Sequence, residues 1–201
     1  MKLYYSPGAC SLASHIALRE AGYDFSLEKV DRSKRTENGE DFLAVNPNGY
    51  VPALKLSDDD IMLEGSAILQ WVADTKPAAG LLPPVGSRER YRTLEWLTFV
   101  SSELHKNFSP FFNPSMPDEA KALYRANLDK RLAHVEGKLK GATGFLTGDR
   151  FTIADAYLFV VLGWAKFLQI DLSPYPAIGA YLGRVASRPS VQAALKAEGL
   201  A

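Results

Sequence analysis

The feature that most constrains the fold is a change in hydrophobic periodicity around a stretch rich in proline and glycine. The segment KPAAGLLPPVGS holds three prolines and two glycines, a composition typical of a linker. Before it, short apolar runs alternate with helical stretches, and after it the apolar spacing is helical throughout. The sequence therefore predicts an α/β domain over residues 1–77, a linker over 78–87 and an all-helical domain over 88–201.

The first domain is predicted to begin with a β-α-β unit. Residues 2–6 and 24–31 have strand patterns, and residues 10–22 between them have helical spacing. A unit of this size implies a right-handed crossover and two parallel strands. An irregular, partly helical connection follows, then two short strands over 51–57 and 60–64 in an antiparallel hairpin. With a last helix over 65–75, this order predicts a small α/β unit of about the size of a thioredoxin-like domain.

Charge and cysteine content exclude several classes of function. Acidic and basic residues number 23 each, which argues against a nucleic-acid groove or an anionic membrane as the main partner. No apolar run reaches the roughly 18 residues of a membrane span. A single cysteine forms neither an internal disulfide nor a thiolate zinc cluster, so we expect no metal and a reducing compartment, most simply the cytoplasm. The balanced charge is compatible with a homodimer.

That cysteine, Cys10, stands where the first helix is predicted to begin. Unsatisfied N–H groups and the positive end of the helix dipole lower the pKa of a thiol in this position. Cys10 is thus either a functional thiol or a small buried residue, and its position favours function. Ser11 is a candidate helix cap and a second donor, whereas Tyr4 and Tyr5 are more typical of a strand core.

Two further motifs fit a peptide-like ligand. Val51 precedes Pro52 at the opening of a strand, where its N–H and C=O can pair with a peptide main chain. Glu64, Gly65 and Ser66 lie between a strand and a helix, with Ser66 as the candidate N-cap. The N–H groups there suit a carboxylate and Glu64 suits an ammonium, so together they suit an amino acid zwitterion. The alternatives are an ordinary strand-opening proline and a plain helix cap.

The helical domain begins with a polar stripe. Thr98, Ser102 and His105 share one face at helical spacing, which indicates either a ligand-lining surface or a solvated face. A neutral imidazole at His105 can donate to a thiolate or orient it. His15 and His134 are not part of a comparable polar stripe and are predicted to be surface or packing residues.

The motif RFTIADAYLF has a structural interpretation. Thr152 and Asp155 have the spacing of a reciprocal capping box. Such a box nucleates a helix, and the helix that follows is very apolar. We therefore predict no catalytic role for Asp155.

Taken in order along the chain, these pieces resemble the glutathione S-transferases, specifically the bacterial beta class. The resemblance covers essentially the whole chain and rests on YYSPGACSLASHIALREAG, NPNGYVPAL, EGSAILQWVAD, EWLTFVSSELHK, FTIADAYLFVVLGW and VQAALKAEGL. It implies a thioredoxin-like N-terminal domain, an all-α C-terminal domain and a homodimer. It also implies glutathione as a co-substrate and no other cofactor.

The resemblance also implies a set of site residues. Cys10 would lie next to the glutathione sulfur with His105 approaching it, and Arg35, at a position usually held by lysine, would contact the glycine carboxylate. The chain departs from the family pattern at Thr98, where asparagine is frequent, and at Ser66, where valine or alanine is common. The other implied glutathione contacts are Ala9, Val51, Pro52, Glu64, Gly65, Ser102, Glu103, which would reach the ligand of the opposite subunit, and Leu104.

Three functions follow as hypotheses. The first is transfer of glutathione to hydrophobic electrophiles such as nitro- or chloro-aromatics, in a pocket formed by side chains such as Phe108, Phe111, Phe112 and Trp164. The second is thiol–disulfide transfer or reductive dehalogenation through a mixed disulfide at Cys10. The third is a non-catalytic ligand-binding protein on the same scaffold, because a fold does not guarantee an activity.

Overall fold

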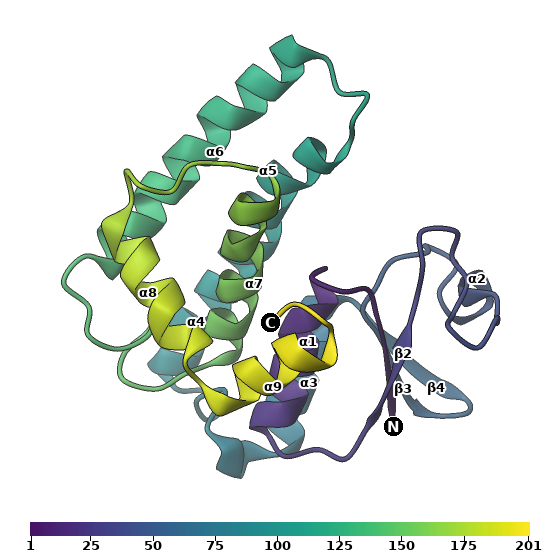
Figure 1. Ribbon diagram of the computed structural model, residues 1–201. Helices are drawn as coiled ribbons and strands as arrows, with labels where there is room; N and C mark the ends of the chain where they lie inside the picture. The colour runs from purple at the N-terminus through teal and green to yellow at the C-terminus, as the bar shows by residue number, and fades with distance from the viewer. The chain divides into compact units, whose positions relative to one another are not determined.

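The computed structural model describes residues 1–201 and divides into two compact units. The first unit is Met1–Leu82 together with Arg188–Ala201, and the second is Pro83–Ser187. This differs from the sequence-based domains, which assigned residues 188–201 to the helical part. The reason is packing, because α9 (Pro189–Ala197) lies against α1 (Ser11–Glu20) of the first unit (Figure 1).

A four-stranded mixed sheet forms the centre of the first unit. Its strand order is β2-β1-β3-β4, with β1 and β2 parallel and the other pairs antiparallel. The hairpin turn consists of residues 58–59, because Ser57 pairs with Asp60. The predicted β-α-β and β-β-α order is confirmed by β1 (Lys2–Tyr5), β2 (Ser26–Lys29), α2 (Phe42–Val45), β3 (Ala53–Ser57), β4 (Asp60–Leu63), α3 (Gly65–Thr75) and the 3-10 turn η1 (Pro77–Ala79).

Alternation along β1 divides the core of this unit between the two faces of the sheet. Leu3 pairs with Leu54 of β3, and both are fully buried. The next side chain, Tyr4, packs against Phe42 of α2 with ring centroids 5.6 Å apart. Figure 1 shows α1 and α3 on one side of the sheet and α2 on the other. Tyr4 and Tyr5 are core residues, as predicted.

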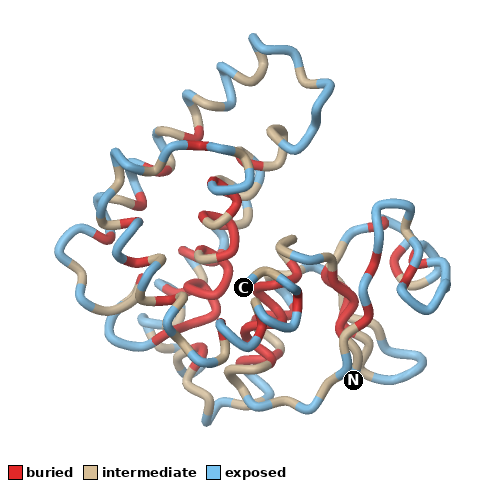
Figure 2. Tube along the Cα trace, viewed as in Figure 1, coloured by how far each residue is buried: buried red, intermediate tan, exposed pale blue.

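The second unit is entirely helical, and α7 forms its core. Eleven of the fifteen residues of α7 are buried, as its apolar sequence predicts (Figure 2). The capping box at its start is confirmed, with Thr152 N–H donating to Asp155 at 2.9 Å. The helices are α4 (Arg88–Phe99), the π-helix η2 (Val100–His105), α5 (Lys106–Phe108), the 3-10 turn η3 (Ser109–Phe112), α6 (Asp118–Leu139), α7 (Ile153–Phe167) and α8 (Pro176–Ala186).

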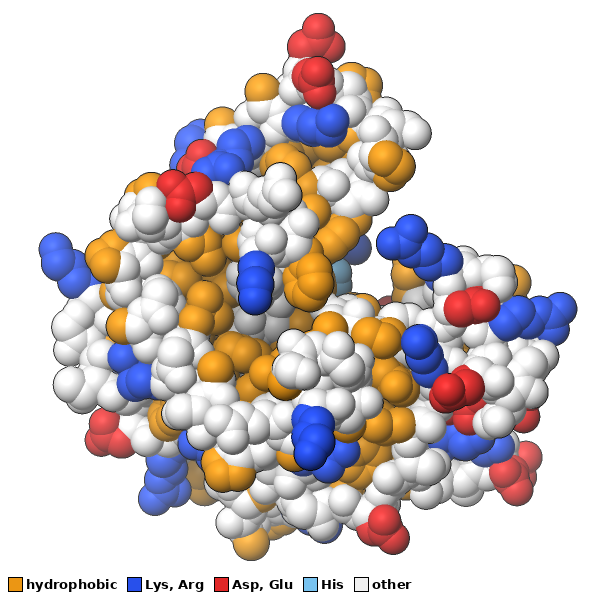
Figure 3. Space-filling view, in the orientation of Figure 1, with side chains coloured by type: hydrophobic (Ala, Val, Ile, Leu, Met, Phe, Trp, Pro, Cys, Tyr) orange, Lys and Arg blue, Asp and Glu red, His pale blue; other side chains and the backbone are white.

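Surface charge and helix hydropathy agree with the composition. Acidic and basic side chains are interspersed on the face shown in Figure 3, without a large field of one sign. None of the helices combines the length and the apolar character that spanning a membrane requires.

Candidate functional site

The thiol of Cys10 lies at the N-terminus of α1, as predicted. Cys10 is the N-cap residue, and its half-buried side chain makes no capping hydrogen bond. Instead, Sγ donates to the carbonyl oxygen of Val51 at 3.2 Å. The positive end of the α1 dipole favours the thiolate form of a sulfur placed there. The fold therefore brings a thiol and the Val51 main chain together from segments 41 residues apart.

Val51 presents an unused main-chain edge. The Val51–Pro52 peptide bond is cis, and β3 begins only at Ala53. The Val51 N–H donates to no group in the protein, and its C=O accepts only from the Cys10 thiol. A Cβ added to Gly65 would lie 3.6 Å from the Pro52 ring, so the start of α3 touches this same segment. One edge thus gathers Cys10, Val51, Pro52 and Gly65.

The chain enters α3 through a residue with a positive φ angle. Glu64 is the N-cap with φ 66° and ψ 112°, and its side chain makes no capping hydrogen bond. The predicted N-cap, Ser66, is instead the second residue of the helix. The strand β4 continues to Leu63, so Glu64 is the single residue that connects β4 to α3. The first N–H groups of a helix have no intrahelical acceptor, so those of Gly65 and Ser66 are available. The Glu64 carboxylate beside them is exposed and unpaired.

Three other predicted residues of the first unit have local partners. The Ser11 hydroxyl is buried and pairs with the main chain of Ser6, accepting at 3.2 Å, so the expectation of a cap or second donor is wrong. The N–H of Ala9 donates to the same residue within the turn before α1. Arg35 is exposed, and the contacts of its side chain stay within its own loop.

A buried polar network behind Cys10 was missed by the sequence analysis. Glu198, just after α9, accepts from the N–H of Gly8 at 2.9 Å and from Nδ1 of His15 at 2.8 Å. The His15 Nε2 accepts from Arg19 at 2.7 Å. His15 is therefore a fully buried residue with hydrogen bonds at both ring nitrogens. This corrects the expectation that it has no polar neighbours. Through Gly8, the C-terminal segment holds the turn that leads to Cys10.

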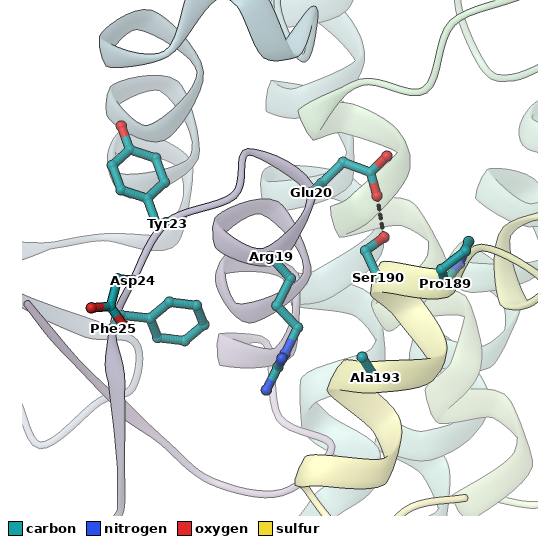
Figure 4. A pocket seen from close by; sticks show the side chains of 8 residues that line it. All are labelled: Arg19, Glu20, Tyr23, Asp24, Phe25, Pro189, Ser190 and Ala193. Atoms are coloured by element: carbon teal, nitrogen blue, oxygen red, sulfur yellow. Dashed lines mark hydrogen bonds between the residues drawn. The ribbon is translucent and has the colours of Figure 1, made fainter.

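A second contact joins α9 to the end of α1. The Glu20 carboxylate pairs with Arg188 and accepts from the Ser190 hydroxyl. Figure 4 shows Glu20 and Ser190 pointing toward one another at a hollow that Arg19, Tyr23 and Phe25 also line. The turn before α1 and the last turn of α1 are thus both attached to the C-terminal segment.

In the second unit, His105 ends the π-helix η2 and lies among aromatic rings. Its Nδ1 is 2.6 Å from the hydroxyl oxygen of Tyr157, and its ring centroid is 4.7 Å from that of Trp164. Phe108 is buried and Phe112 is largely exposed, and both meet Trp164 edge to face. Burial, and then the charge of Lys106, lowers the pKa of His105 to about 4. The imidazole is therefore neutral near pH 7.

The polar stripe differs in part from its prediction. Thr98 and Ser102 are exposed, but the side chain of Leu104 is fully buried. The Glu103 carboxylate accepts from Arg131 Nε at 2.7 Å within its own chain. This stretch includes the π-helix η2, whose hydrogen-bonded loops are wider than those of an α-helix. His105, half-buried, thus has surroundings distinct from those of the two exposed hydroxyls.

The depressed pKa of His105 predicts a pH-dependent stability. The imidazole of His105 is protonated below about pH 6.5 in the unfolded chain but only below about pH 4 in the folded chain. The free energy of unfolding therefore has its full value from this residue above pH 6.5 and decreases as the pH falls toward 4. We expect urea denaturation at pH 5 to show about 2 kcal/mol less stability from this residue than at pH 7. NMR titration should place the His105 midpoint near 4, and His105→Gln should remove this part of the pH dependence. A midpoint near 6.5 would contradict the prediction.

Comparison with known families agrees with this arrangement. The family description "Glutathione S-transferase, N-terminal domain" matches residues 8–75, and "Glutathione S-transferase, C-terminal domain" matches residues 99–189. The chain is 54% identical over 201 residues to glutathione S-transferase GstA of Escherichia coli O157:H7, with all of both chains covered.

Solved structures show the same fold at full coverage of both chains. A sphingomonad glutathione S-transferase complexed with glutathione is 53% identical, with a TM-score of 0.94. A bacterial beta-class glutathione S-transferase from Sphingomonas chungbukensis is 50% identical, also with a TM-score of 0.94.

Proposed function

The chain belongs to the bacterial beta class of the glutathione S-transferase family, and from this premise we propose that it transfers reduced glutathione to hydrophobic electrophiles. The observation that carries the proposal is the unused main-chain edge of Val51 beside the Cys10 thiol. A tripeptide docks on such an edge through main-chain hydrogen bonds, which leaves its own sulfur near the N-terminus of α1. No metal or additional cofactor enters this proposal.

The two ends of glutathione have complementary partners in the first unit. The γ-glutamyl ammonium pairs with the exposed Glu64 carboxylate, and its carboxylate accepts from the N–H groups of Gly65 and Ser66. The Ser66 hydroxyl adds a further donor. Arg35 binds the glycine carboxylate, and a guanidinium does so with more than one N–H. Ala9 and Pro52 complete the surface in contact with the tripeptide.

The chemistry needs a sulfur anion and a positioned electrophile. Bound glutathione loses its thiol proton to solvent, and the helix dipole at Cys10 stabilises the resulting thiolate. We assign to neutral His105 the role of hydrogen-bond donor to that sulfur, as the resemblance to the family implies. The thiolate attacks an electrophilic carbon, the C–S bond forms, and the leaving group departs with the electron pair of the bond that breaks. The protein contributes orientation and electrostatic stabilisation.

The aromatic cluster around Trp164 favours aromatic electrophiles, so nitro- and chloro-aromatics are the proposed substrate class. Phe111 precedes Phe112 in the 3-10 turn η3 and is proposed to line the same pocket. Thr98 and Ser102 offer exposed hydroxyls to glutathione, and Leu104 contributes only main-chain atoms. Detoxification in the cytoplasm by a homodimer, with Glu103 reaching the glutathione of the other subunit, is part of the same proposal.

The test is a conjugation assay with glutathione and a chlorodinitrobenzene, followed by absorbance. We expect a glutathione-dependent product, with Val51→Pro reducing kcat/KM because it removes the unpaired N–H. Calorimetry with S-methylglutathione separates binding from chemistry. Binding without product from a panel of electrophiles would instead indicate the non-catalytic binding protein.

A second activity is favoured by the half-exposed thiol of Cys10. Its thiolate attacks a glutathione mixed disulfide, forms a Cys10–glutathione disulfide and releases the other thiol. A second glutathione thiolate then attacks, which regenerates Cys10 and yields oxidised glutathione. We expect mass spectrometry to find a glutathione-sized adduct that reductant removes. Cys10→Ala should lose this activity, and conjugation retained in that variant would show two separate roles.

A further inference from the structure

His105 has one close hydrogen-bonding partner in the protein, and that partner is a tyrosine on the core helix α7. The Tyr157 hydroxyl oxygen lies 2.6 Å from His105 Nδ1, although the two residues are 52 positions apart. Tyr157 is only 5% exposed, so its hydroxyl is held in place by packing. The other ring nitrogen of His105, Nε2, makes no hydrogen bond within the protein and is open to solvent.

The length of this contact indicates which group donates. Hydrogen bonds from hydroxyl groups are shorter than those from N–H groups, which are commonly about 2.9–3.0 Å long. A phenol is also the better acid, and an imidazole nitrogen is the better base. A neutral imidazole has one donor and one acceptor nitrogen. A hydroxyl proton on the Tyr157 oxygen therefore makes Nδ1 the acceptor and leaves the ring proton on Nε2.

The orientation of the ring is also constrained by α7. Tyr157 and Trp164 lie two helical turns apart on this helix and so share one face. Both meet the His105 ring at steep angles, 90° for Tyr157 and 77° for Trp164. The backbone of His105 is anchored as well, because its carbonyl accepts from the Ser109 hydroxyl at 2.8 Å.

We propose that Tyr157 is a positioning residue that fixes His105 in the Nε2-protonated tautomer and directs this N–H outward as a donor. Its catalytic consequence rests on the proposed function, in which that N–H stabilises the glutathione thiolate. An imidazole in the other tautomer would present a lone pair to the anion and repel it. The role of Tyr157 is thus indirect, because it acts through His105.

The first experiment is ¹⁵N NMR of the full protein without glutathione. We expect His105 Nε2 in the range of a protonated ring nitrogen and Nδ1 in the range of a hydrogen-bonded acceptor. Tyr157→Phe should move the Nδ1 signal toward that of a nitrogen without a hydrogen bond. A protonated Nδ1 in the unsubstituted protein would overturn the proposal, whatever the enzyme activity proves to be.

The second experiment is kinetic and uses a matched control. Tyr157→Phe should lower kcat for conjugation about tenfold with little change in KM for glutathione, and should have no further effect in a His105→Ala background. Tyr181→Phe also removes a buried tyrosine hydroxyl from the same unit, one that donates to Asp155 at 3.0 Å. It should affect stability but not the His105 signals. An unchanged kcat in Tyr157→Phe would overturn the catalytic role.

Discussion

Glu198→Ala is expected to lower the free energy of unfolding by about 3 kcal/mol, because it leaves two buried donors without an acceptor. The carboxylate accepts from the Gly8 N–H at 2.9 Å and from His15 at 2.8 Å, and the side chains of both Glu198 and His15 are inaccessible to solvent. Urea denaturation followed by circular dichroism measures the loss. Since Gly8 precedes Cys10 in the same turn, we also expect a higher KM for glutathione.

Two control variants make this result specific. Glu198→Gln keeps one acceptor oxygen, so its loss of stability should be intermediate. Glu95→Ala removes an exposed carboxylate whose only ion pair is with Arg92, at 2.6 Å, and surface pairs contribute little. It should leave the denaturation midpoint almost unchanged. If Glu198→Ala were as stable as Glu95→Ala, the network would not hold the C-terminal segment to α1.

Glu64→Gly is expected to weaken glutathione binding about 30-fold while raising stability by about 1 kcal/mol. The affinity falls because a charge-assisted hydrogen bond to the ammonium, about 2 kcal/mol, is lost. Stability rises because φ 66° with ψ 112° strains any residue with a Cβ, and glycine relieves this strain. Calorimetry with S-methylglutathione and urea denaturation measure the two effects.

Glu64→Gln separates the charge from the backbone. It keeps the strained conformation and loses the carboxylate, so affinity should fall while stability stays unchanged. Together the two variants test whether the strain serves the site. Unchanged affinity in both would show that Glu64 does not bind the tripeptide and that the γ-glutamyl end lies elsewhere.

Strands and helices were predictable where local periodicity determines them. The spacing over residues 65–75 predicted α3 correctly, and Leu3 and Tyr4 alternate between the faces of β1 as their positions require. The capping box of Thr152 and Asp155 was likewise correct, because its two members are three residues apart. Such features depend on neighbours in sequence, and their geometry follows from the helix or strand itself.

Predictions failed where a local rule had more than one outcome. Serine is a residue type that favours N-caps, which is why Ser66 was predicted to be one. The strand before it continues to Leu63, so Glu64 is the N-cap instead. Helical spacing predicted one face for Thr98, Ser102 and His105, but it gave no sign of the π-helix that spans residues 100–105. Nothing in the local sequence indicates a π-turn, because the packing of the whole unit selects it.

By itself, the sequence determined the α/β and helical character of the two parts, the thiol at the start of α1 and the Val51–Pro52 motif. Only the tertiary structure decided that Glu198 reaches Gly8 across 190 residues, and that Tyr157 meets His105. The physical reason is range. Periodicity and capping act over a few residues, whereas a buried hydrogen bond forms wherever packing brings a donor and an acceptor together, at any separation along the chain.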